Sequence, residues 1–140
     1  MVSEVPPAAR ESNLAWLLRR LVEEVPYTRS AVLLSADGLP TASHGLTPDL
    51  ADQMSAIAAG LFSLARTAAV RFGDSDGVRQ VVAELDDSLL FVSSAGFGSV
   101  LTVLAGREAD AGVLGYEMAH LVKSVRPFLA TPARRTGAVT

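Results

Sequence analysis

The chain has 140 residues, of which 49% are hydrophobic and 19% charged, and its formal net charge at pH 7 is −3. This length predicts a single globular domain, and an acidic chain with one lysine, Lys123, gives no electrostatic reason to expect a nucleic-acid partner. No apolar run approaches the roughly 20 residues that span a bilayer, and the absence of cysteine excludes disulfides, thiol catalysis and thiolate metal sites.

The N-terminal segment lacks the apolar region of a secretory signal, so we expect a cytoplasmic protein whose residues 1–11 form a flexible tail. Apolar residues then recur at helical spacing and predict an amphipathic helix over residues 13–25, ended by Pro26. Its stripe consists of Leu14, Leu17, Leu18, Leu21 and Val25. Trp16 lies off this stripe and either covers a neighbouring element, which is the simpler interpretation, or meets a partner.

A β-hairpin is predicted next. Residues 30–35 are mostly apolar and β-prone, a weaker strand follows at residues 40–43, and Asp37-Gly38 lies between them. Asp-Gly between two such runs favours a tight turn.

The longest predicted element is a helix over residues 47–73. Thr47 can cap its first turn, Pro48 suits the first helical position, and Gly73 marks its end. Helical periodicity predicts a core stripe of Leu50, Met54, Ile57, Leu61, Ala65, Ala68 and Phe72.

A second stripe on this helix is made of small residues. Ala56, Gly60, Ser63 and Thr67 recur at spacings of four, three and four, where a solvated helix normally carries Lys, Glu or Gln. We therefore expect the helix to be buried on two sides, once in its own domain and once against another surface.

Three strands are predicted close together at residues 78–85, 89–95 and 99–105, joined by Asp86-Asp87 and by Gly96-Phe97-Gly98. The last two carry apolar residues on both faces, which predicts a sheet covered on both sides. The first is apolar mainly on one face and suits a position near an edge. Asp110 is expected to cap a last helix that Pro127 weakens, followed by a flexible tail at residues 130–140.

Most signatures of catalysis are missing. The sequence has no phosphate-binding G-x-x-x-x-G-K-[ST] motif. His44 and His120 have no evident set of fellow metal ligands, Asp86-Asp87 is more simply a turn than a pair of catalytic acids, and Ser93-Ser94 lacks the context of a nucleophile elbow. We expect no enzyme activity, no catalytic residue, no cofactor and no metal site.

The order of elements, αββαβββα over residues 12–129, resembles the Roadblock / dynein light chain family, of the bacterial kind associated with small Ras-like GTPases. The segments that carry the resemblance are WLLRRLVEEVP (16–26), AVLLSADGLPTASHG (31–45), AAGLFSLARTAAVRFG (58–73), VRQVVAELDDSLLFVSSAGFGSVLTVLA (78–105) and GYEMAHLVKSV (115–125). The resemblance implies a Roadblock/profilin-like α+β fold, in which a five-stranded antiparallel sheet has the 47–73 helix on one face and the terminal helices on the other.

The resemblance also implies a homodimer, formed by the 47–73 helix and by pairing of the 78–85 strand. The corresponding interface residues are Ala56, Gly60, Ser63, Thr67, Arg79, Val81 and Ala83. Arg66 and Arg71 flank the small-residue stripe and are the candidate contacts for a GTPase. The function implied is that of a non-enzymatic scaffold or regulator, including a GTPase-activating-protein-like one, for a small Ras-like GTPase. A sensor kinase or another signalling protein is a further partner to consider.

Two alternatives stay open at this point. PAS-like ligand-binding modules also lay helices on a five-stranded antiparallel sheet, although the inward positions identified here are apolar and offer no convergent polar groups for a ligand. A structural subunit without a GTPase partner is the other alternative.

Overall fold

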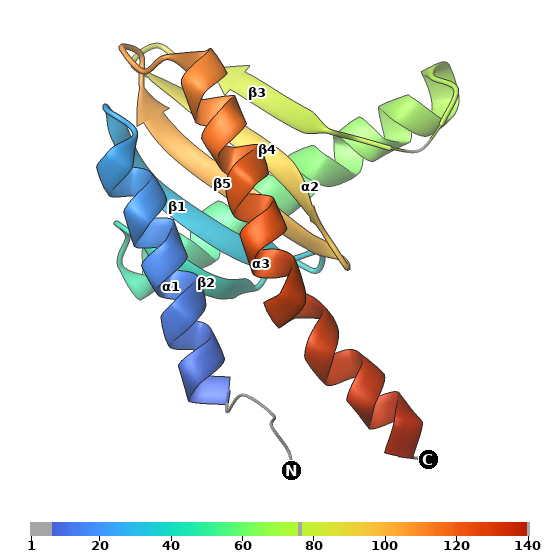
Figure 1. Cartoon of the computed structure of the whole chain (residues 1–140). Coiled ribbons are helices and arrows are strands. Elements are labelled where there is room, and N and C mark those ends of the chain that lie inside the picture. The colour runs from blue at the N-terminus through green and yellow to red at the C-terminus, as the bar shows by residue number, and fades with distance from the viewer. Residues whose placement is uncertain (1–6, 76, 140) are drawn as a thin grey trace.

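The computed structural model describes residues 7–75 and 77–139, with side chains described from residue 14 to residue 129 apart from residue 76 (Figure 1). In chain order the elements are α1 (Pro7–Glu24), β1 (Thr28–Ser35), β2 (Pro40–His44), α2 (Pro48–Phe72), β3 (Gln80–Glu84), β4 (Ser88–Gly96), β5 (Ser99–Gly106) and α3 (Ala111–Val139). This is the predicted order of elements.

The five strands form one sheet in the order β2-β1-β5-β4-β3, and every neighbouring pair is antiparallel. The predicted five-stranded antiparallel sheet is confirmed, and so is the edge position of β3. Asp86 and Asp87 lie in the turn between β3 and β4, where their main-chain carbonyls accept hydrogen bonds from Arg107 and Arg29. The simple interpretation of this acidic pair as a turn is therefore correct.

Two apolar layers cover the sheet, one on each face. Helices α1 and α3 pack on one face around Phe91, Leu101 and Met118, whereas α2 crosses the other face over Val32, Val92 and Val100 (Figure 1). The predicted stripe of α1 is confirmed, because Leu14, Leu18, Leu21 and Val25 are all buried. Trp16 is half-exposed, and the guanidinium carbon of Arg20 lies 5.1 Å from the centroid of its ring.

Helix α2 begins as predicted. The Thr47 hydroxyl accepts a hydrogen bond from the Leu50 amide at 3.3 Å, Pro48 occupies the first turn, and the Gly73 amide donates to the Ala69 carbonyl at 2.9 Å. Asp49 lies in the first turn and Arg71 in the last, each at the end of the helix dipole that stabilises its charge.

The predicted core stripe of α2 is wrong at four of its positions. Leu50, Ile57, Ala68 and Phe72 are exposed, and the buried residues of the helix are Ala51, Ser55 and Ala58. Met54, Leu61 and Phe62 pack partly against the sheet. The physical reason is size, because small side chains let the helix lie close to the sheet and to the β1–β2 turn, where a Cβ on Gly38 would lie 3.7 Å from Ala56 and from Ala59.

Both terminal helices are longer than the sequence pattern predicts. Helix α1 begins at Pro7, within the expected N-terminal tail, and α3 continues past Pro127 to Val139, through the segment expected as a C-terminal tail. Proline is pre-organised for a first helical turn, and the alanine and arginine residues near both ends are strong helix formers, which periodicity alone does not register. Residues 1–6 and residue 140 of the two predicted tails lie outside the described residues. Within the described part of the chain, no helix is long and apolar enough to cross a membrane.

Candidate interaction site on helix α2

The outer face of α2 carries the small-residue stripe predicted from the sequence. Ala56, Gly60, Ser63 and Thr67 are all exposed, and a Cβ built on Gly60 would have no neighbouring heavy atom within 4 Å. A glycine in an exposed helix interior costs about 1 kcal/mol relative to alanine. The described part of the subunit therefore offers no packing contact that explains Gly60.

Large apolar side chains lie beside this stripe. Ile57 is 52% exposed and Leu64 70%, and Phe72 at the end of the helix is 88% exposed. The C-terminal turns of α2 project beyond the sheet on the β3 side (Figure 1). Large apolar side chains exposed along one helix are candidates for an interaction site.

The predicted interface residues of β3 have mixed positions. Val81 and Ala83 turn towards α2 and are partly buried beneath it, whereas Val82 on the opposite face is exposed. Arg79, just before the strand, is exposed, and its carbonyl accepts a hydrogen bond from the Ser93 hydroxyl at 3.2 Å. In the sheet β3 pairs with β4 alone, so its other edge is available for a further strand.

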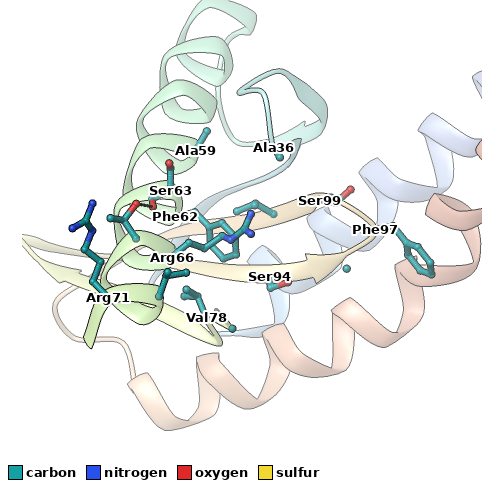
Figure 2. A pocket seen from close by; sticks show the side chains of 16 residues that line it. Ala36, Ala59, Phe62, Ser63, Arg66, Arg71, Val78, Ser94, Phe97 and Ser99 are labelled. Atoms are coloured by element: carbon teal, nitrogen blue, oxygen red, sulfur yellow. Dashed lines mark hydrogen bonds between the residues drawn. The ribbon is translucent and has the colours of Figure 1, made fainter. Parts of the chain in front are cut away.

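The two candidate arginines lie in one groove, which has a volume of about 740 Å³ (Figure 2). Arg66 and Arg71 reach it from α2, and the β4–β5 hairpin forms much of its opposite side. Figure 2 shows Arg66 extending from the helix over the strands near Ser94, and Arg71 at one end of the groove. The remaining lining residues are Ala36, Ala59, Phe62, Ser63, Thr67, Val70, Gly77, Val78, Gly96, Phe97, Gly98, Ser99 and Val100.

Phe97 is the residue of this site that sequence reasoning missed. It lies at the tip of the β4–β5 hairpin, 65% exposed, with φ of 55°. A bulky residue in the left-handed region is uncommon, because its Cβ crowds the backbone there. The available signal was a phenylalanine between two glycines at a turn that normally prefers Asn-Gly.

The histidines do not join this site. His120 borders a small cleft of about 80 Å³ between α1 and α3, together with Glu117, Glu24 and Arg20, on the opposite face of the sheet from α2. His44 ends β2. Among the described residues, no group of three or more His, Asp or Glu side chains is placed to hold a metal ion.

Comparisons with known proteins agree with the fold. The family model of the Roadblock/LC7 domain matches residues 14–105. A crystal structure of a Roadblock/LC7 domain from Streptomyces avermitilis is 67% identical, with a TM-score of 0.82, and the match covers 84% of this chain and 98% of the other. A second Roadblock/LC7 domain from that organism is 37% identical, with a TM-score of 0.65 and coverages of 79% and 96%.

A more distant structure shares the fold alone. The gliding protein MglB from Thermus thermophilus is 17% identical, with a TM-score of 0.74, and the match covers 89% of this chain and 92% of the other. No curated protein matches the sequence. The family model extends over more than half of the chain, and the first structure is closely similar along nearly its whole length, so this chain belongs to the Roadblock/LC7 domain family.

Proposed function

We propose that this protein is a non-enzymatic, homodimeric scaffold or regulator that binds a small Ras-like GTPase and modulates its nucleotide cycle or its localisation. The observation that carries the proposal is the exposed outer face of α2, where a stripe of small residues lies beside Ile57, Leu64 and two arginines. Membership of the Roadblock/LC7 family supports it, since the family resemblance implies this role.

Self-association is the first part of the proposal. The exposed edge of β3 and the end of α2 lie on the same side of the subunit (Figure 1). A second copy related by twofold symmetry would continue the sheet through β3 and bring the two α2 helices together along Gly60. Such a dimer would remove Leu64 and Phe72 from water, which is favourable by about 25 cal/mol per Å² of apolar surface buried.

GTPase binding is the second part. Ras-like GTPases expose acidic and apolar residues on their switch regions, and a pair of α2 helices would present an apolar centre with two copies each of Arg66 and Arg71 around it. Arginine suits this position because its planar guanidinium can bind a carboxylate through two hydrogen bonds and is weakly hydrated.

Two measurements test these parts. Light scattering on the purified protein should give the mass of a dimer, and a monomer at tens of micromolar would contradict the proposed homodimer. Arg66→Glu and Arg71→Glu should keep the dimer but weaken binding to the cognate GTPase in its GTP-analogue form by about 2 kcal/mol or more. Affinities of both variants within about twofold of the parent would place the GTPase elsewhere on the surface.

The isolated chain is expected neither to bind nor to hydrolyse nucleotide, because it has no phosphate-binding loop. Calorimetric titration with GTP and ATP checks this, and saturable binding at micromolar affinity would contradict it. The PAS-like alternative calls for a ligand enclosed in the domain. The groove beside α2 is open to solvent, so we retain the regulator as the better supported function.

A further inference from the structure

The sheet has two outer strands, β2 and β3, and their free edges differ (Figure 1). Strand β2 contains Pro40, which has no main-chain N–H, and its pairing with β1 is irregular between Leu33 and Leu34. Proline and irregular pairing both hinder an edge strand from accepting another strand. Strand β3 contains no proline and pairs with β4 in unbroken register from Gln80 to Glu84. The β3 edge is therefore the better one for a further strand.

The hydrogen-bond pattern of β3 determines which residues direct their main-chain groups to this free edge. In an antiparallel pair, alternate residues exchange both bonds with the neighbouring strand, and the residues between them direct both groups away from it. The Leu85 amide donates to the Ser88 carbonyl at 2.8 Å. The Arg79 carbonyl accepts a bond from the Ser93 hydroxyl at 3.2 Å, so the odd-numbered residues of β3 face β4. The residues whose N–H and C=O groups point outward are therefore the even-numbered ones, Gln80, Val82 and Glu84.

The available edge ends at Glu84 because of Arg107 in the β5–α3 loop. Its guanidinium donates to the Leu85 and Asp86 carbonyls, each at 3.1 Å. It also donates to the Glu84 carboxylate at 3.2 Å. The next carbonyl that could face outward, that of Asp86, is thus already bound within the subunit. An edge held in this way is preformed and loses little conformational freedom on pairing.

The side chains of the three outward residues lie on the face of the sheet that carries α3. Val81 and Ala83 pack towards α2, and side chains alternate between the two faces along a strand. In agreement, Oε1 of Gln80 lies 4.0 Å from the position of a Cβ on Gly115 of α3. Val82 is 51% exposed on this face.

We propose that the β3 edges of two copies pair in a single antiparallel register centred on Val82. Val82 then lies opposite Val82 of the second copy, and Gln80 lies opposite Glu84. The inference rests on the proposed function, which supplies the homodimer, and it adds the register and the residues that select it.

Main-chain hydrogen bonding favours this register over its neighbours. When the pairing is centred on Val82, every outward N–H and C=O group between Gln80 and Glu84 has a partner on the second copy. A shift by two residues leaves the outward groups at one end of each strand without a partner, and each lost bond weakens the pairing. A shift by one residue places outward groups opposite inward ones.

The side chains favour the same register. Two exposed Val82 side chains would cover each other, which removes apolar surface from water. The Gln80 amide would donate to the Glu84 carboxylate, which can accept several hydrogen bonds and has one from Arg107. In registers shifted by two residues, Gln80 or Glu84 would face Val82 instead, and this polar contact would be lost.

Crosslinking tests the register directly, because the chain has no cysteine and an introduced thiol is the only one. In Val82→Cys the two thiols belong to opposed residues with Cα atoms about 5.5 Å apart, within the range of a disulfide. Gln80→Cys and Glu84→Cys each place their thiols about 13 Å apart along the strands. Mild oxidation, or a short thiol-reactive crosslinker, should therefore link Val82→Cys and an exchanged mixture of the other two variants, but neither of those alone. Stronger linking of Val82→Cys to either of the other two variants than to itself would show a shifted register and overturn the proposal.

A charge change tests the opposed pair without a crosslink. Gln80→Glu places two carboxylates opposite each other and should raise the dissociation constant of the dimer by about fivefold or more, with a smaller effect at high salt. Adding Glu84→Gln to the same chain restores a Glu–Gln pair and should return the constant to within about twofold of the parent. Thr41→Glu, exposed on β2 at the other edge, adds the same charge and should leave the dimer unchanged. Sedimentation equilibrium measures the constants, and urea unfolding checks that each chain is folded. Equal effects of Gln80→Glu and Thr41→Glu, or no recovery in the double variant, would refute the register.

The outcomes separate this inference from the proposed function. A monomeric parent protein would mean that the β3 edge receives a strand of another protein, and both the homodimer and the register would fail. A dimeric parent in which Val82→Cys does not crosslink and Gln80→Glu has no effect would leave the homodimer standing and refute the register alone.

Discussion

Gly60→Leu gives the sharpest test of how two subunits would meet. Within one subunit, a Cβ on Gly60 has no heavy atom within 4 Å, so the described structure offers no steric objection to a larger side chain. Leucine is a far better helix former than glycine, and the substitution should stabilise an isolated α2 by roughly 0.8 kcal/mol. The monomer should therefore be at least as stable as the parent.

The dimer should respond in the opposite direction. If two α2 helices approach closely along Ala56, Gly60, Ser63 and Thr67, an inserted isobutyl group forces them apart. Overpacking a tight interface costs about 1–3 kcal/mol at each site, and a twofold interface contains the site twice. The dissociation constant should rise by about 30-fold or more, which corresponds to roughly 2 kcal/mol.

Sedimentation equilibrium over a range of protein concentrations measures this constant, and urea unfolding of the same samples measures stability. Gly60→Ala is the matched control, since it adds the helix propensity with a single methyl group and should affect dimerisation much less. An unchanged dimer in Gly60→Leu would show that the small-residue stripe is not where the helices meet. Loss of folding in the same variant would show that Gly60 has a role inside the subunit.

The remaining predictions concern the stability of the subunit. In a urea titration, Gly45→Ala should lower the free energy of unfolding by about 3 kcal/mol, because φ is +90° and the new Cβ would lie 2.5 Å from the Arg29 carbonyl oxygen. Gly98→Ala should lower the free energy of unfolding by only about 1 kcal/mol, because φ is +74° but the space around the new Cβ is open. Ser55→Ala should raise the free energy of unfolding by about 1 kcal/mol, because its buried hydroxyl has no hydrogen-bond partner among the described residues. A lower free energy of unfolding in this variant would mean that the hydroxyl is satisfied. Thr47→Ala should cost about 1 kcal/mol by removing the cap on the Leu50 amide, and Thr47→Ser should restore it.

The candidate site was only partly predictable. The small residues of α2 were found from their spacing, and Arg66 and Arg71 from their position beside them. The groove itself was not, because it joins α2 to a hairpin that lies well beyond the end of the helix in the sequence. No local pattern indicates that Arg66, Ser94 and Phe97 line one groove, since this arrangement depends on the path of α2 across the sheet.

Interactions between residues close together in the sequence are sufficient to determine several of the individual helices and turns. The cap at Thr47, the turn at Asp37-Gly38 and the regular stripe of α1 each depend on interactions within a few residues, so the sequence alone determines them. The same holds for the two apolar faces of β4 and β5, which require covering layers on both sides of the sheet.

Only the tertiary structure decided which face of α2 meets the sheet. Periodicity finds an apolar stripe, and this helix has apolar residues over much of its circumference. Ala51, Ser55 and Ala58 are buried against the sheet, because their small size permits a close approach, whereas Ile57, Leu64 and Phe72 are exposed. Burial against the sheet depends on the shape of the opposing surface as well as on hydrophobicity, and that surface is assembled from strands distant in the sequence.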